Sequence, residues 1–130
     1  MTQTSVTIEH LEALLSPSGR ALLDRLCGED LVAADSMRLG TTLRTQFPPH
    51  LVAAALSQQE LRRTAAVKFS RADRMFFTRS GLAQASAESI SRYRAPRFAD
   101  CTRLGDLCTG IGGDLISLAD RRETLAVDID

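Results

Sequence analysis

The feature that most constrains the fold of this chain is a cluster of three glycines between two strand-like stretches. Residues 104–107 suit a strand that enters a turn, and residues 125–127 suit a second, buried strand. Gly110, Gly112 and Gly113 lie between them, and the residues that follow the glycines suit a short helix. A strand, a glycine turn, a helix and a strand form the βαβ pattern. The sequence therefore predicts an α/β arrangement for this part of the chain.

The preceding residues predict helices instead. Thr7 can cap a first helix, and a second helix that starts at Pro17 should end near Gly28. A third helix is expected over 30–46. The strongest helix is predicted over 50–69, because that stretch is rich in Ala, Leu, Gln and Arg and holds neither Gly nor Pro. Ser86 is the expected N-cap of one more helix. We therefore expect a helical N-terminal domain over residues 1–100, and over 101–130 the start of an α/β domain.

Composition limits the environment in which the protein works. Hydrophobic residues make up 44% of the chain and charged residues 25%, as in ordinary soluble globular proteins. Cys27, Cys101 and Cys108 form no C-x-x-C pair, which argues against a disulfide framework or a zinc site. The first ten residues lack a signal-peptide pattern, and the longest apolar stretch, 51–56, is too short to span a bilayer. We expect a cytoplasmic protein with neither a membrane nor a metal partner.

The glycine cluster is suited to holding a nucleotide-type ligand. Glycines let the backbone turn sharply and remove the Cβ atoms that would keep a ligand away from the loop. The helix that follows points its free N–H groups toward the same place. Asp128 ends the second predicted strand, and a carboxylate there can accept both hydroxyl protons of a ribose.

Two other nucleotide sites fit the spacing less well. The dinucleotide fingerprint requires a Gly or Ala three residues after its second glycine. Here that position is Leu115, which would crowd the contact between helix and strand, so NAD and FAD are disfavoured. A P-loop is excluded because no Gly-Lys-Ser/Thr follows. A fragment of an NAD-binding oxidoreductase stays as an alternative.

The two halves of the pattern also resemble a known family. Residues 106–114 resemble motif I of class I S-adenosylmethionine-dependent methyltransferases, and residues 125–130 resemble the end of the second strand of those enzymes. The paired form is similar to the group related to trimethylguanosine synthase. It is closer still to bacterial relatives that carry a THUMP-like domain. Residues 75–85 and 92–99 resemble the helical lead-in of those bacterial proteins.

The resemblance implies a Rossmann-like methyltransferase domain whose first βαβ unit is residues 101–130, and S-adenosylmethionine as the cofactor. It implies that the glycines border the methionine end of the cofactor. Asp106 would hold the turn or meet the cofactor's amino group, and Asp128 would bind the ribose. Cys108 stands where many class I enzymes have Gly. The implied cofactor-binding set is Asp106, Cys108, Gly110, Gly112, Gly113 and Asp128.

Charge along the chain suggests a substrate. Residues 59–104 contain ten Arg or Lys and four Asp or Glu, a net charge of +6 directly before the acidic glycine region. Arginines beside an active site can hold phosphates, so Arg92, Arg94 and Arg97 are candidate RNA-binding residues. The alternative is that these arginines solvate one helix face and pair with the acidic segment.

The leading hypothesis is the N-terminal portion of an RNA-directed methyltransferase. The motif that contacts the target base in such enzymes, an Asn or Asp followed by Pro-Pro and an aromatic residue, is absent from the sequence. Class I transfer depends mainly on positioning an already activated methyl group. We therefore expect these 130 residues alone to have no methyltransferase activity and no catalytic residue. A non-catalytic helical interaction module is the further alternative.

Overall fold

The computed structural model describes residues 7–27, 33–120 and 122–129; for residues 33–36 it describes the backbone only. It contains helices and one small parallel sheet, which confirms a mixed α/β chain at that level. The chain divides into two compact units, residues 1–63 and 64–130. The domain boundary predicted after residue 100 falls inside the second of these units.

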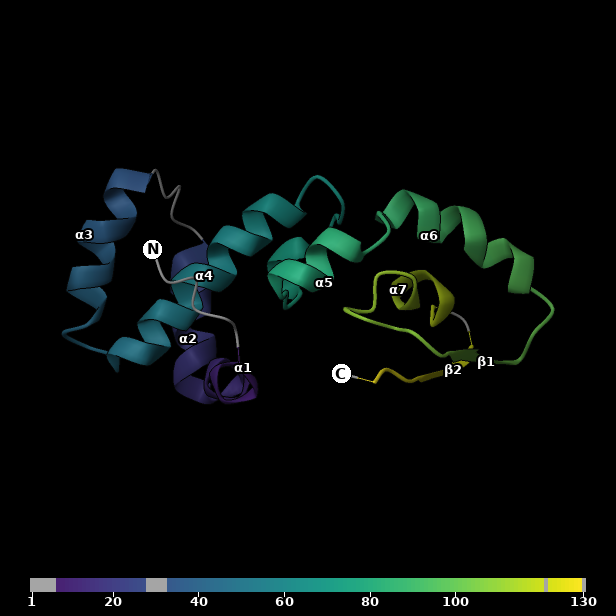
Figure 1. The fold of residues 1–130 in the computed structure, drawn as a ribbon, viewed down its shortest axis with the longest axis horizontal. Helices are drawn as coiled ribbons and strands as arrows, with labels where there is room; N and C mark the ends of the chain where they lie inside the picture. The colour runs from purple at the N-terminus through teal and green to yellow at the C-terminus, as the bar shows by residue number, and fades with distance from the viewer. Residues whose placement is uncertain (1–6, 28–32, 121, 130) are drawn as a thin grey trace. The chain divides into compact units, whose positions relative to one another are not determined.

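The first unit is helical (Figure 1). It contains α1 (Ile8–Leu15), α2 (Pro17–Cys27), α3 (Ala33–Leu43) and most of α4 (Pro49–Ala65). Thr7 caps α1 as predicted: its Oγ1 accepts a hydrogen bond from the backbone N of His10 at 3.4 Å. The His10 Nδ1 in turn accepts from the backbone N of Thr7 at 3.2 Å, which closes a reciprocal capping box.

The turn from α1 into α2 is tightly packed. The Ser16 hydroxyl donates to the carbonyl of Ala13 at 2.6 Å and accepts from the backbone N of Gly19 at 3.1 Å. A Cβ at Gly19 would lie 2.3 Å from the Ala13 carbonyl oxygen and 2.5 Å from the Leu14 Cα. Any side chain at position 19 would therefore collide with backbone, so this crossing of α1 and α2 requires glycine.

Each helix of the first unit contributes apolar side chains to one core. The fully or almost fully buried members with large side chains are Leu14, Leu22, Leu23, Leu26, Leu43, Leu51, Val52 and Leu61. Gln59 ties α4 to the end of α2, because its Nε2 donates to the carbonyl of Leu26 at 3.2 Å. The predicted end of the second helix at Gly28 and the predicted start of the third at residue 30 lie outside the described residues.

The second unit begins at the end of α4, which stops at Ala65 rather than at the predicted residue 69. Its other elements are η1 (Ala72–Arg74), α5 (Arg79–Gln84), α6 (Glu88–Arg94), η2 (Ala95–Phe98), β1 (Arg103–Asp106), α7 (Leu115–Leu118) and β2 (Glu123–Ala126). The rings of Phe69 and Phe77 are buried, with their centroids 5.9 Å apart. Lys68, the single lysine of the chain, donates from Nζ to the carbonyls of Leu82 at 2.9 Å and Ala85 at 3.0 Å.

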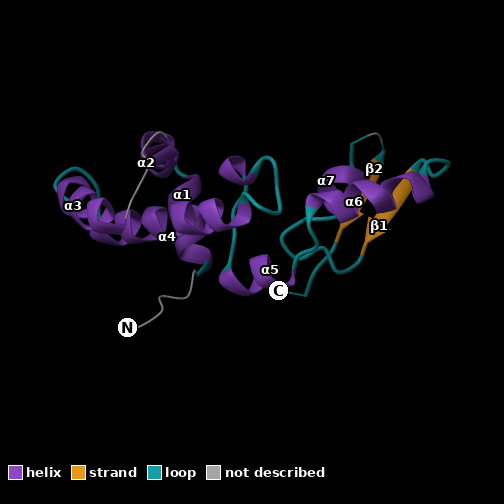
Figure 2. Cartoon of the chain, turned by 90° about the horizontal axis from the view of Figure 1, so that it is seen from above, coloured by secondary structure: helices purple, strands orange, loops and turns teal. Residues whose placement is uncertain are grey.

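The sheet consists of β1 and β2, which pair in parallel with Arg103 opposite Glu123 and Asp106 opposite Ala126. α7 connects them in sequence and contacts both β2 and α6 (Figure 2). The strand, glycine turn, helix and strand thus occur in the predicted order. Among the residues that the structure describes, no helix is both long enough and apolar enough to cross a membrane.

Candidate functional site

The glycine loop, residues 107–114, leaves β1 at the carboxyl edge of the parallel pair. The ladder continues past the strand ends, since the backbone N of Val127 donates to the carbonyl of Asp106 at 2.8 Å. The backbone N of Thr109 then donates to the carbonyl of Val127 at 3.1 Å. These two bonds fix the start of the loop beside the end of β2. Ligands of open parallel sheets bind at this edge.

Two of the three predicted glycines have backbone conformations that disfavour side chains. Gly110 has a φ of +50° and Gly112 a φ of +78°. The backbone N of Gly112 donates to the carbonyl of Thr109 at 2.8 Å and closes the turn. Among the residues that the structure describes, none has an atom within 4 Å of a Cβ built at Gly110, so that side of the loop is open with respect to them. This open side is where a ligand could approach the backbone.

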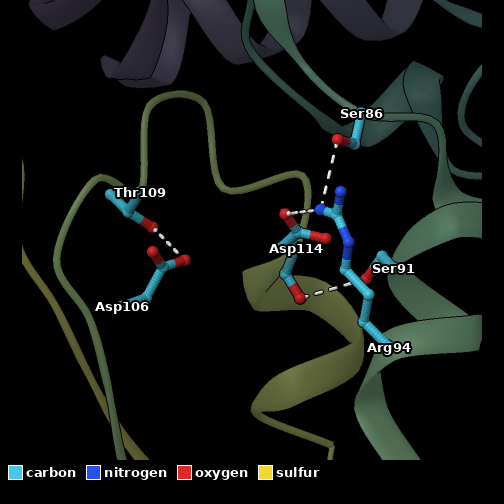
Figure 3. Close-up of polar contacts among 6 residues, drawn as sticks. All are labelled: Ser86, Ser91, Arg94, Asp106, Thr109 and Asp114. Atoms are coloured by element: carbon cyan, nitrogen blue, oxygen red, sulfur yellow. Dashed lines mark hydrogen bonds and ion pairs between the residues drawn. The ribbon is translucent and has the colours of Figure 1, made fainter.

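The two predicted carboxylates hold the loop from two sides. Asp128 is exposed, and its Oδ2 accepts from the backbone N of Gly110 at 2.6 Å while its Oδ1 accepts from the backbone N of Ile129 at 2.8 Å. Asp106 is half-buried, and its Oδ2 accepts from the Thr109 hydroxyl at 3.1 Å (Figure 3). The fold therefore brings Asp106, Gly110 and Asp128 together around the loop.

Gly113 differs from the other two glycines because it is buried. A Cβ at this position would lie 3.3 Å from the Ser86 carbonyl oxygen and 3.5 Å from two ring atoms of Phe69. The structure accounts for this glycine by close packing against the segment that precedes β1. Cys108 is exposed and makes no disulfide. Contact of Gly113 and Cys108 with a cofactor stays a prediction.

The glycine loop packs against α5, a contact that the sequence did not reveal. A Cβ at Gly81, in α5, would lie 2.4 Å from the Ile111 Cγ2 and 2.9 Å from the Thr78 Oγ1. Ile111 therefore packs directly on the backbone of α5. The signal available in the sequence is weak: a glycine three residues after Thr78, which caps α5 by accepting from the backbone N of Gly81 at 3.0 Å.

Asp114 anchors the other end of the loop to α6 (Figure 3). Its Oδ2 accepts from the Arg94 Nη1 at 2.8 Å, and its carbonyl accepts from the buried Ser91 hydroxyl at 3.1 Å. Arg94 Nη1 also donates to the Ser86 Oγ at 3.4 Å. The expectation that Ser86 caps α6 is wrong, because the N-cap is Ala87 and the Ser86 hydroxyl faces Arg94 instead.

The three arginines predicted to hold RNA all have partners within the second unit. Arg92 pairs with Glu88 one turn earlier in α6, and Arg94 pairs with Asp114. The Arg97 guanidinium lies over the Tyr93 ring, 5.3 Å from its centroid. The alternative reading of these arginines, as partners of the acidic segment, therefore applies to Arg94. Their side chains are still reachable, with 68% of Arg92 and 46% of Arg94 exposed.

Glu88 should make the stability of the second unit depend on pH. Its Oε2 accepts from the backbone N of Ser70 at 2.7 Å, and this bond, with the nearby Arg92, holds the pKa of Glu88 below its ordinary 4.5. A lowered folded-state pKa contributes stability above the unfolded-state pKa, and that contribution is lost as the pH falls through the folded-state value. We expect Glu88→Gln to lower the urea midpoint at neutral pH. Between neutral pH and about pH 3, the midpoint of the variant should fall by less than that of the parent protein. Glu12→Gln, which changes an exposed glutamate of α1, is the control. A Glu88→Gln curve parallel to the parent curve at all pH values would contradict this assignment.

Within the described residues no group of three or more His, Cys, Asp or Glu side chains could hold a metal ion. In comparisons with known proteins, no curated protein and no solved structure matches the chain. One family model does: residues 7–65 match a domain of unknown function, DUF8688. The matched stretch begins beside α1 and ends with α4, and it leaves the glycine loop outside. The chain is thus similar to that family over its first helices.

Proposed function

We propose that the second unit is the S-adenosylmethionine-binding front part of a class I, Rossmann-like methyltransferase. The observation that carries this proposal is the 2.6 Å hydrogen bond from the backbone N of Gly110 to Asp128. It joins the carboxylate at the end of β2 to the glycine loop after β1, which is the juxtaposition that a nucleoside site in a parallel sheet needs. The resemblance of residues 106–114 and 125–130 to motif I and the second strand of that family supplies the identity of the cofactor.

The residues present fit such a cofactor. Among the described residues the loop is open above Gly110, and the exposed Asp128 is a carboxylate, the type of acceptor that ribose hydroxyl donors need, with oxygens that can each accept more than one hydrogen bond. When bound, S-adenosylmethionine supplies an activated methyl group. The chain's own residues would bind and orient it: Asp128 at the ribose, the loop backbone along the methionine end, and Asp106 as the support of the turn.

The packing around Leu115 favours this cofactor over a dinucleotide. A Cβ at Gly112 would lie 3.7 Å from the Leu115 Cδ2, so the leucine packs against the loop where the dinucleotide fingerprint needs a small residue. RNA is the substrate class that we propose, on the basis of the basic stretch before β1. The first unit, which carries the DUF8688 match, would then serve as an accessory helical region of the same protein.

The test is calorimetric titration of the whole chain with S-adenosylmethionine, S-adenosylhomocysteine and NAD. We expect both S-adenosyl ligands to bind and NAD not to bind. Asp128→Asn should weaken S-adenosylhomocysteine binding by at least about tenfold, the usual effect of losing a charged hydrogen-bond acceptor. Asp100→Asn changes an exposed acid away from the loop and should leave binding unchanged. NAD binding in place of the S-adenosyl ligands would support the oxidoreductase alternative, and no binding by any of the three would refute the proposal.

A further inference from the structure

The outward side of α6 and η2 carries an exposed stripe that the cofactor site does not use. Ser91 and Arg94 contact Asp114, whereas Tyr93 is largely exposed and shares its side of α6 with Ile90, three residues earlier. Arg97, in η2, lies over the Tyr93 ring. Ile90, Tyr93 and Arg97 form this stripe. We propose that Tyr93, held by Arg97, is a stacking site for an unpaired base of single-stranded RNA. This inference deepens the RNA part of the proposed function and does not require cofactor binding.

The Tyr93 ring is arranged as a stacking platform. The side chain is 70% exposed, although an aromatic ring gains free energy by leaving water. The Arg97 guanidinium lies over one face at 5.3 Å from the centroid, a cation–π contact that restricts the ring. With one face occupied by Arg97 and most of the ring in solvent, the other face is open to a base. Base–aromatic stacking of this kind is tolerant of sequence.

The surroundings supply the charge that a nucleic-acid backbone requires. Among the described residues Arg97 forms no ion pair with a carboxylate, so its charge is available to a phosphate. Arg92 and Arg94 are the sequence neighbours of Tyr93 on α6, with 68% and 46% of their side chains exposed. Their carboxylate partners are turned inward, with 13% of Glu88 and 33% of Asp114 exposed. The exposed charge carried by α6 and η2 near Tyr93 is therefore mainly positive, although Asp100 is an exposed acid shortly after them.

The stripe favours RNA over a lipid surface. Its apolar members are few and only partly exposed, Ile90 at 44% and Phe98 at 38%, on a helix of 7 residues followed by a 3-10 turn. A helix that lies in a membrane interface needs a longer and wider apolar face. An exposed ring next to arginines offers a face for a base together with positive charge for phosphates, which is the usual construction of single-strand sites.

The affinity test uses the whole chain and a fluorescein-labelled single-stranded RNA of mixed sequence, followed by anisotropy at low and high salt. We expect Tyr93→Ala to weaken binding by about tenfold or more, as loss of one stacked base does, and Tyr93→Phe to retain it within about twofold. Arg97→Ala should weaken binding and lower its salt dependence. Val67→Ala removes another exposed apolar side chain of the second unit, 88% exposed, and should have no effect.

A spectroscopic test identifies the contact itself. The chain has one tyrosine and no tryptophan, so its intrinsic emission comes from Tyr93. RNA should quench that emission, while inorganic polyphosphate, which has charge but no bases, should not. Equal affinity of Tyr93→Ala and the parent, equal quenching by polyphosphate, or binding to anionic phosphatidylserine vesicles without RNA binding would each overturn the proposal. RNA stacking without S-adenosyl binding would support this inference and refute the proposed cofactor. S-adenosyl binding without RNA stacking would support the cofactor and refute this inference.

Discussion

Replacing Phe69 by Ala is expected to destabilise the second unit by about 3–5 kcal/mol, the range for removing a buried aromatic ring. The Phe69 side chain is only 2% exposed, and its ring lies 5.9 Å from that of Phe77. A Cβ built at Gly113 would lie 3.5 Å from two atoms of the Phe69 ring. The cavity would open directly beneath the glycine loop, so the site should lose order together with the core.

Hydrogen exchange followed by mass spectrometry can check this result, because it reports on each unit separately. Phe69→Ala should increase exchange in peptides from residues 104–118, while peptides from residues 8–27 and 33–43 keep their protection. Phe98→Ala is the matched control, since that ring is 38% exposed and its loss should change little. Unchanged protection of residues 104–118 in the Phe69→Ala variant would show that the loop does not depend on this ring.

The second large effect is expected in the first unit, where Gly19→Ala should cost about 3 kcal/mol or more, the upper range for overpacking. Alanine is normally favoured over glycine within a helix by about 1 kcal/mol. Here the new Cβ would meet the backbone of Ala13 at 2.3 Å and of Leu14 at 2.5 Å. Backbone atoms cannot rotate away as a side chain can. The clash therefore outweighs the helix preference of alanine, and the substitution lowers the free energy of unfolding.

The measurement is urea unfolding followed by circular dichroism at the helical band. Gly40→Ala provides the control, because among the described side chains its Cβ would meet the Leu56 Cδ1 alone, at 3.2 Å, the movable end of a side chain. That variant should stay within about 1 kcal/mol of the parent protein, since the helix preference of alanine offsets a small shift. If Gly19→Ala unfolds at the same urea concentration as Gly40→Ala, the tight crossing of α1 and α2 is not a constraint on the fold.

Local chemistry explains what could be predicted from the sequence. Thr7 caps α1 because its hydroxyl reaches the first turn, and Pro17 and Pro49 begin α2 and α4 because their fixed φ suits a helix start. The glycine turn between parallel strands also follows from short-range pattern. The gathering of Asp106, Gly110 and Asp128 requires only that the two strands pair in register.

Long-range packing explains what the sequence did not reveal. Gly81 receives Ile111 across a separation that carries no periodic signal, and pairing of the arginines with the acidic segment, which Arg94 and Asp114 show, is only one of two alternatives that the sequence leaves open. The lead-in helices therefore belong to the same compact unit as the glycine loop, although the change in composition near residue 100 suggests a boundary there. Arg94 is an example, because the sequence does not distinguish an arginine exposed to solvent from one that pairs with a carboxylate.

The contacts of Lys68 couple chemical modification to folding. Its Nζ donates to two carbonyls at the end of α5, and no other lysine exists to compete for an amine-directed reagent. Acylation removes the charge and leaves too few donors for both carbonyls. Acylation of the side-chain amine therefore breaks at least one of these two hydrogen bonds. The rate at which Lys68 is acylated, measured beside that of the α-amino group, reports how firmly the end of α5 is held by this side chain.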